Sequence, residues 1–410
     1  MITISRLALY VGLAFSVSAL PVTKRAPEAI PGKYIVTLKS GVPVSAVKTH
    51  LNWVRHMHSR SLSRRDESGI EKIYNIKDFN GYAGSFDDAT IDEIRNSDDV
   101  ATVEQDMIWH LLDTPTPKHR SNLTTQHDAP WGLGSISHRK PNFTEYIYDA
   151  SAGEGTTAYV IDTGIRATHV EFEGRAHLGF NAFPGADDND NNGHGTHVAG
   201  TIAGKTYGVA KKAKVVAVKV FDYGASTTSI VLSGFTWAIS NITSPTTSII
   251  SMSLGGPPSD AFNSAIASAF NYGVLSVVAA GNDGVDAAGV SPASAPEAIT
   301  VGAIDINNEK PWWSNWGTRV DIFAAGVDVL SAWAGSDEDW YVAEGTSMAT
   351  PHVSGLVLYL RGLEKRGAGG GVIRTVAEVV ESVKGLGTRG VVKNRGTGSP
   401  DLVAYNGSGA

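Results

Sequence analysis

The most conspicuous absence is cysteine: the 410 residues contain none, so no disulfide bond can hold this fold together. A chain without cysteine is typical of reducing compartments, although large exported domains can also fold without such bonds. At this length the chain can bury a sizeable core, and two domains are expected. The absence therefore excludes a small disulfide-stabilised scaffold and leaves the compartment open.

Long apolar runs and a strong charge are missing as well. Beyond the N-terminal segment, no stretch reaches the about 20 consecutive apolar residues that span a bilayer. The 34 Lys and Arg against 41 Asp and Glu give a net charge of −7, which offers no basic surface for nucleic acid or an anionic membrane. We therefore expect neither a nucleic-acid partner nor a membrane partner.

The N-terminus settles the expected compartment. Arg6 precedes an apolar run over residues 7–17, and small residues up to Ala19 supply a cleavage point. This layout predicts a signal peptide over residues 1–19, because the run is too short for a membrane anchor. We expect a secreted protein. Four Asn-x-Ser/Thr sequons agree with export, and each is a candidate for glycosylation: Asn122, Asn142, Asn241 and Asn406.

A small module follows the leader. Its hydrophobic pattern predicts strands and helices in the order β-α-β-β-α-β, over residues 34–38, 44–57, 73–76, 81–86, 90–95 and 100–109. This order favours a ferredoxin-like α+β module. Residues 113–118 contain two prolines and are expected to form an exposed linker that a protease can cut.

From Trp131 onward the pattern changes. β-branched apolar runs typical of strands buried on both faces occupy residues 158–162, 215–221, 248–254, 274–280 and 298–304. Helical stretches lie between them, notably residues 230–239 and 260–272. Strands that alternate with helices predict an α/β domain around a doubly wound, mainly parallel sheet.

Three short segments suggest nucleophilic catalysis. Asp162 ends a buried strand, His194 lies in Gly-His-Gly-Thr-His, and Ser347 opens a helix-like run over residues 348–360. A serine hydroxyl is a poor nucleophile unless a base takes its proton, and an imidazole titrates near working pH. A buried carboxylate can fix the imidazole tautomer, and a helix N-terminus offers free N–H groups to an oxyanion. The sequence therefore predicts a catalytic triad of these three residues.

The three segments, in the chain order Asp, His, Ser, resemble the subtilase family, and within it the proteinase K branch of secreted fungal enzymes. The resemblance extends over about residues 129–406, and residues 31–36 and 103–106 are similar to the inhibitory propeptide of that family. It implies a signal peptide (1–19), a propeptide (20–118) and a subtilisin-like peptidase domain (119–410). The cut that releases the propeptide is expected between residues 112 and 121.

The resemblance also implies a substrate site. Asn282 would be the second oxyanion donor beside the Ser347 N–H, although a plain turn asparagine is the alternative. Two backbone segments are expected to bind an extended peptide, one at Ser253, Leu254 and Gly255 and one at Gly224. Small or apolar walls at Leu254, Ala280 and Gly281 would favour apolar or aromatic residues of the substrate. The loop around Gly224 is one residue shorter than in proteinase K, so the resemblance does not define the substrate contacts at that edge.

No cofactor is expected for catalysis. The resemblance implies a structural Ca²⁺ site made by the carbonyl groups of Pro296 and Ala298 and the carboxylate of Asp321, because oxygen ligands suit this ion. A zinc site at His194 and His197 is disfavoured, because such a site needs a third ligand and a general base, and no Glu follows either histidine in the required pattern. The expected partners are protein or peptide substrates and the chain's own propeptide, and the enzyme is expected to be a monomer.

Two other functions remain as alternatives. A catalytically silent member would act as a binding protein, but the intact set of Asp162, His194, Ser347 and Asn282 argues against it. An esterase could use the same nucleophile, and the segment Gly-Thr-Ser-Met-Ala approaches the esterase elbow, but esterases place the serine first in the chain. The resemblance to secreted subtilisins of skin fungi adds keratin-like proteins to the expected substrates.

Overall fold

The computed structural model describes residues 29–60, 68–111, 126–222, 224–366 and 374–408. The predicted signal peptide, the proline-containing segment 113–118 and the sequon at Asn122 lie outside the described residues. Within the described part of the chain, no helix is long and apolar enough to cross a membrane.

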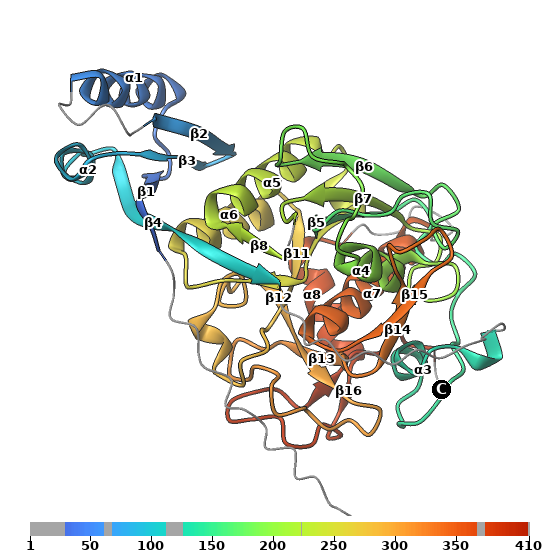
Figure 1. Cartoon of the computed structure of the whole chain (residues 1–410). Helices are drawn as coiled ribbons and strands as arrows, with labels where there is room; N and C mark the ends of the chain where they lie inside the picture. Colours follow the sequence, from blue (N-terminus) through green and yellow to red (C-terminus); the bar gives the residue numbers. More distant parts are fainter. Residues whose placement is uncertain (1–28, 61–67, 112–125, 223, 367–373, 409–410) are drawn as a thin grey trace, which may run out of the picture.

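The N-terminal module has the predicted element order, and its sheet is antiparallel in the order β4-β1-β3-β2. Its elements are β1 (Ala29–Leu38), α1 (Val44–Arg60), β2 (Gly69–Ile76), β3 (Phe79–Ser85), α2 (Asp88–Arg95) and β4 (Val100–Leu111). The helices pack on one face of the sheet around a core that includes Val36, Val54 and Tyr82. The strands of this module also contact two helices of the larger domain (Figure 1).

Over its described residues, the larger domain is built on nine strands in the order β16-β17-β13-β12-β11-β9-β5-β7-β6, and every pair except β16–β17 is parallel. The strands are β5 (Thr157–Asp162), β6 (Ala176–Asn181), β7 (Lys214–Lys219), β9 (Ser248–Met252), β11 (Leu275–Ala279), β12 (Ala298–Ile304), β13 (Ile322–Ala325), β16 (Thr388–Arg389) and β17 (Leu402–Val403). This confirms the expected mainly parallel α/β sheet.

Helices cover both faces of this sheet, as a doubly wound fold requires. The helices are α3 (Trp131–Ser137), α4 (His194–Ala203), α5 (Thr228–Asn241), α6 (Asp260–Asn271), α7 (Thr346–Arg366) and α8 (Val376–Leu386). Residues of α4 and α7 pack in one hydrophobic cluster, whereas residues of α5 and α6 pack in another. Short elements complete the domain: β8 (Ala225–Thr227), β10 (Leu254–Gly255), the hairpin of β14 (Val329–Ala332) and β15 (Trp340–Ala343), and the 3-10 turns η1 (Gln126–Asp128), η2 (Pro245–Thr247) and η3 (Ala287–Gly289).

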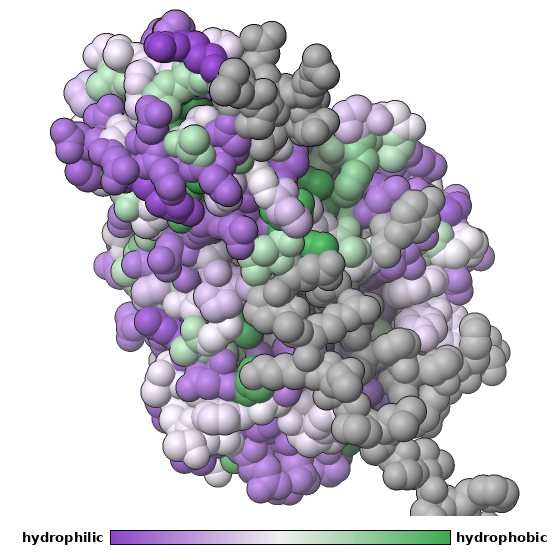
Figure 2. All heavy atoms as spheres, turned by 60° about the vertical axis from the view of Figure 1, so that its left-hand side comes forward, coloured by the Kyte–Doolittle hydropathy of each residue, from purple (hydrophilic) through white to green (hydrophobic). Residues whose placement is uncertain are grey.

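Burial explains why the central strands carry continuous apolar runs. Every residue of β9, β11 and β12 is buried, because helices cover the sheet on both sides. All ten residues of α4 are buried as well, so this helix is central rather than amphipathic. Figure 2 shows a surface on which hydrophilic residues predominate and hydrophobic side chains gather only in small groups.

Candidate active site

The predicted carboxylate and imidazole meet at the carboxyl end of the parallel sheet. Asp162 is the last residue of β5, and His194 is the first residue of α4. Asp162 Oδ1 lies 2.7 Å from His194 Nδ1, and both side chains are buried. Burial raises the pKa of the Asp162 carboxyl, and the facing His194 lowers it in part. The contact leaves the second ring nitrogen, Nε2, as the atom that can exchange a proton with a nucleophile.

Ser347 is the second residue of α7, the helix that packs against α4. Its Oγ donates a hydrogen bond to the carbonyl oxygen of Ser253 at 3.1 Å, and Ser253 Oγ donates to the carbonyl oxygen of Ser347 at 2.8 Å. Ser253 lies between β9 and β10, so these two bonds attach the predicted nucleophile to the predicted substrate segment. The helix N-terminus adds positive potential and backbone N–H donors beside the hydroxyl.

Asn282 lies beside the same helix start. Its Oδ1 accepts hydrogen bonds from Thr346 N at 2.9 Å and Thr346 Oγ1 at 2.8 Å. Because the amide oxygen is held by Thr346, the amide nitrogen, which carries two N–H donors, is directed away from that residue. The structure thus brings Asn282 to the residue that precedes Ser347, as an oxyanion role requires.

Asn315 is a residue that sequence reasoning missed. Its Oδ1 accepts from Asp283 N at 3.1 Å and Val285 N at 3.0 Å, and its Nδ2 donates to Ala280 O at 2.8 Å. These bonds hold the loop that carries Asn282. Gly281 has a φ of +106°, and a Cβ there would lie 2.3 Å from the Asn315 amide nitrogen, so the close approach requires glycine.

Strand β4 of the N-terminal module occupies the predicted substrate segments. It pairs antiparallel with β10, where Leu254 faces Leu111 and Gly255 faces His110, and with β8, where Ser226 faces Trp109. Figure 1 shows this strand running from the module onto the larger domain. Gly224 directly precedes β8 with a φ of +89°. The module therefore binds as an added strand, which is how a protease groove can hold an extended peptide.

Trp109 anchors this strand in the larger domain. Its side chain is fully buried, and its ring centroid lies 4.8 Å from that of Phe262. A Cβ on Gly256 would lie 2.3 Å from the Trp109 ring, so this glycine makes the room that the indole fills. The indole of β4 is therefore held among apolar groups of the larger domain.

Two carboxylates of β4 attach the module to helix N-termini. Asp106 Oδ1 accepts from Ser229 N of α5 at 3.0 Å. Glu104 accepts from Asp260 N at 3.1 Å and Ala261 N at 3.3 Å, at the start of α6. Burial raises the pKa of both carboxyls, whereas their hydrogen bonds lower it. The positive end of each helix offsets part of the cost of burying these groups.

The residues predicted to bind Ca²⁺ do not fit that ion as they are arranged here. Asp321 Oδ1 lies 2.7 Å from Lys384 Nζ of α8, and Asp321 Oδ2 accepts from Thr300 N at 2.9 Å. An ammonium group in contact with the carboxylate competes with a divalent cation for the same oxygen. Among the described residues, no group of three His, Cys, Asp or Glu side chains could hold a metal.

His197 has a structural environment. Its Nε2 lies 3.1 Å from the carbonyl oxygen of Val329, and burial lowers its pKa to about 3. The ring is therefore neutral at ordinary pH and bonded to backbone of β14. This is the environment of a structural histidine within a buried helix.

The three described sequons differ in exposure. Asn142 and Asn241 are exposed, and both stay candidates for glycosylation. Asn406 is 4% exposed, and its Nδ2 donates to Ile147 O at 2.8 Å. Burial of this side chain leaves no room for a glycan on its amide nitrogen.

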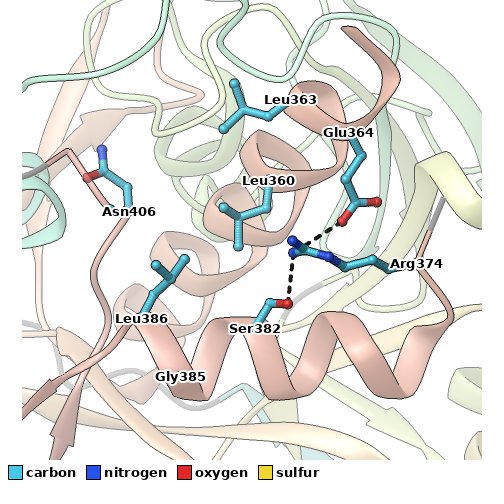
Figure 3. Close-up of a pocket in the computed structure, with 9 residues that line it drawn as sticks. Leu360, Leu363, Glu364, Arg374, Ser382, Gly385, Leu386 and Asn406 are labelled. Carbon is cyan, nitrogen blue, oxygen red and sulfur yellow. Dashed lines mark hydrogen bonds and ion pairs between the residues drawn. The ribbon is translucent and has the colours of Figure 1, made fainter. Parts of the chain in front are cut away.

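A cavity of about 600 Å³ lies away from these groups, between the C-terminal half of α7 and α8. Figure 3 shows leucine side chains along it and Arg374 between Glu364 and Ser382. Arg374 bonds Ser382 Oγ at 2.8 Å and pairs with Glu364 at 3.6 Å. Because Ser347 lies at the opposite end of α7, this cavity does not belong to the candidate active site.

Comparison with known proteins identifies the class. A family model described as the subtilase family matches residues 153–379, and one described as peptidase inhibitor I9 matches residues 33–112. Subtilisin-like proteinase Mp1 of Magnaporthiopsis poae is 52% identical over 99% of each chain. Alkaline protease 1 of Aspergillus flavus is 53% identical over 94% of this chain and 93% of its own. The chain belongs to the subtilase family.

Further similarities agree with this assignment. The cuticle-degrading serine protease of Arthrobotrys oligospora is 47% identical over 97% of this chain and 96% of its own. The crystal structure of a cold-adapted subtilisin-like serine proteinase matches with a TM-score of 0.62 and 38% identity, covering 68% of this chain and 98% of that one. The protein is a subtilisin-type serine endopeptidase preceded by an I9 inhibitor module. The expectation of an enzyme rather than a silent binding protein is confirmed.

Proposed function

We propose that the chain is a secreted zymogen whose peptidase domain hydrolyses proteins through an acyl-enzyme formed on Ser347. The observation that carries this proposal is β4 paired between β8 and β10, because it places an extended peptide along the segment to which Ser347 is bonded. A peptide substrate in that position would bring its carbonyl group to the hydroxyl.

The proposed chemistry assigns one role to each polar group. Ser347 Oγ attacks the carbonyl carbon while His194 Nε2 takes the hydroxyl proton, and the imidazolium is stabilised by Asp162 at 2.7 Å. The Ser347 N–H and Asn282 Nδ2 bind the oxyanion of the tetrahedral intermediate. His194 then gives the proton to the leaving amine, and water repeats the sequence to release the acid product.

The module acts in this proposal as an inhibitor that covers the groove until it is removed. We assign residues 1–19 to the signal peptide, 20–118 to the propeptide and 119–410 to the peptidase domain. The described part of β4 ends at Leu111, directly before the range of residues 112–121 in which the sequence predicts the cut. After the cut, Glu104, Asp106 and Trp109 would still hold the module as a product-like inhibitor.

The proposed substrate preference is broad, with apolar or aromatic residues before the scissile bond. Leu254 and Ala280 are fully buried beside the candidate site, and Gly281 is buried as well. Trp109 offers an example of an aromatic side chain in the groove. We extend the proposal to structural proteins such as keratin, since a relative is named as a cuticle-degrading protease.

Replacement of the nucleophile tests the mechanism. Ser347→Ala should lower casein hydrolysis by about 10⁵- to 10⁶-fold, because the covalent intermediate can no longer form. Ser240→Ala, which changes an exposed serine of α5, is the matched control and should keep full activity. Casein digestion by purified Ser347→Ala at the wild-type rate would contradict the assignment.

A further inference from the structure

Asp190 is a buried carboxylate in the loop between β6 and α4 that the triad chemistry does not use. Its side chain is 5% exposed. Both of its oxygens are saturated by five hydrogen bonds, which come from Thr163 Oγ1 (2.8 Å), Asn192 N (3.0 Å), Gly193 N (2.8 Å), Thr196 N (2.8 Å) and Thr196 Oγ1 (2.7 Å). Such a concentration of donors on one carboxylate defines a fixed position rather than a solvated loop residue.

The five bonds join the two chain segments that carry Asp162 and His194. On one side, Thr163 follows Asp162 directly, and Thr163 N donates to Asp162 Oδ1 at 2.8 Å. On the other side, Gly193 and Thr196 flank His194 in the first turn of α4. Thr163 Oγ1 also accepts from Gly195 N at 2.9 Å, so the strand end and the helix start are bonded to each other as well as to Asp190.

We infer that Asp190 is a positioning residue of the active site: it fixes the end of β5 against the start of α4 and so holds His194 at hydrogen-bond distance from Asp162. This inference rests on the triad proposed above. Proton transfer depends on alignment at the scale of about 1 Å. A group that acts on Asp162 and His194 only through neighbouring residues can therefore affect turnover strongly. The predicted effect is on the chemical step and not on substrate binding, because the Asp190 carboxylate is buried and its five hydrogen bonds go to the segments around Asp162 and His194, not to β8 or β10.

The chemistry of the site requires a carboxylate. All five partners are hydrogen-bond donors, and an ionised carboxylate has only acceptor atoms. An asparagine has the same shape but would turn its NH₂ group towards either Thr163 and Gly193 or Thr196, so donors would face donors. A buried donor without an acceptor carries a desolvation penalty, which the loop can relieve only by moving.

Steady-state kinetics of Asp190→Asn test the inference. In the full chain after self-maturation, we expect kcat for a chromogenic peptide to fall about 30- to 100-fold, with KM within about threefold of the wild type. Asp188→Asn, a neighbouring exposed aspartate, is the matched control and should keep the wild-type kcat. A kcat of Asp190→Asn within threefold of the wild type, or a loss confined to KM, would overturn the inference.

Variants of Thr163 keep the test decisive if Asp190→Asn does not fold. Thr163→Val removes the bridging hydroxyl and should lower kcat about tenfold, whereas Thr163→Ser keeps the hydroxyl and should recover most of kcat. Where Asp190→Asn does fold, its loss and the loss in Thr163→Val should not add in the double variant, because both act on one connection. Wild-type kcat in Thr163→Val, or full additivity, would overturn the inference.

These outcomes are separate from the failure of the proposed function. If Ser347→Ala retains activity, the triad itself is wrong. If Ser347→Ala is inactive while Asp190→Asn and Thr163→Val turn over normally, only the positioning role falls. Thermal unfolding of each variant completes the test, because a loss of kcat without a matching loss of folded protein points to alignment rather than stability.

Discussion

The sheet of the larger domain and the sheet of the N-terminal module differ in how their faces are covered. The larger domain covers both faces of its sheet with its own helices, and strands such as β9 and β11 are buried at every position. The N-terminal module covers only one face of its sheet with α1 and α2. Residues of the other face, including Tyr74, Ile76 and Phe79, pack in the same hydrophobic cluster as Val231 and Phe262 of α5 and α6.

The difference indicates that the module completes its core only on the larger domain. A module of this size buries little apolar surface by itself, so its folding and its docking are expected to be coupled. The larger domain, in turn, receives β4 between β8 and β10, which have few other partners in the described sheet. Each part therefore supplies surface that the other lacks.

Removal of the module is the most severe way to break this relation. Expression of the chain without residues 20–118 should give mostly misfolded, inactive protein, because a parallel sheet relies on distant contacts that form slowly without a template. Casein hydrolysis measures the activity of the deletion variant, and circular dichroism measures its folded structure. Full-length Ser347→Ala is the control, since it should be inactive but folded. Full activity of the deletion variant would show that the larger domain folds independently.

Trp109→Ala should weaken the binding of the N-terminal module to the larger domain, with a smaller effect than deletion of the module. Loss of a buried indole typically costs about 3–5 kcal/mol, so the cut module should leave at least about a hundredfold more readily. We expect activity to appear much sooner after self-cleavage, with the cut followed on gels and activity followed with a peptide substrate. Val44→Ala, on the exposed side of α1 at 68% exposure, is the control and should keep the wild-type delay. An unchanged delay in Trp109→Ala would contradict the anchoring role.

The part of the site that lies in regular elements was predictable from the sequence. Asp162, His194 and Ser347 stand at a strand end and at two helix starts, where the local motifs are distinctive, and the segments at Ser253 and Gly224 adjoin short strands. The predicted sheet and the module topology follow from hydrophobic patterns whose period is set by the local backbone. These predictions needed no knowledge of the tertiary contacts.

The residues that support the site were not predictable in the same way. Asp190 and Asn315 lie in loops, and their roles depend on backbone N–H groups that any residue can offer. The buried position of Asn406 and its bond to Ile147 join chain segments 259 residues apart. A sequence pattern carries no information on such contacts. It therefore singled out the groups that we propose to react, and it missed the residues that hold them in place.

The smallest expected effect concerns Asp321, where the prediction and the structure differ. If Lys384 replaces the cation, EGTA should leave the thermal unfolding temperature of the mature enzyme unchanged. Lys384→Met should lower it by only about 1–3 °C, because a partly exposed ion pair contributes about 0–1 kcal/mol. Scanning calorimetry with and without Ca²⁺ measures both, and Lys393→Met, which changes a lysine outside this pair, is the control. A clear drop in EGTA that Asp321→Asn abolishes would restore the calcium site, since a bound divalent ion would then outweigh the ammonium for the same carboxylate.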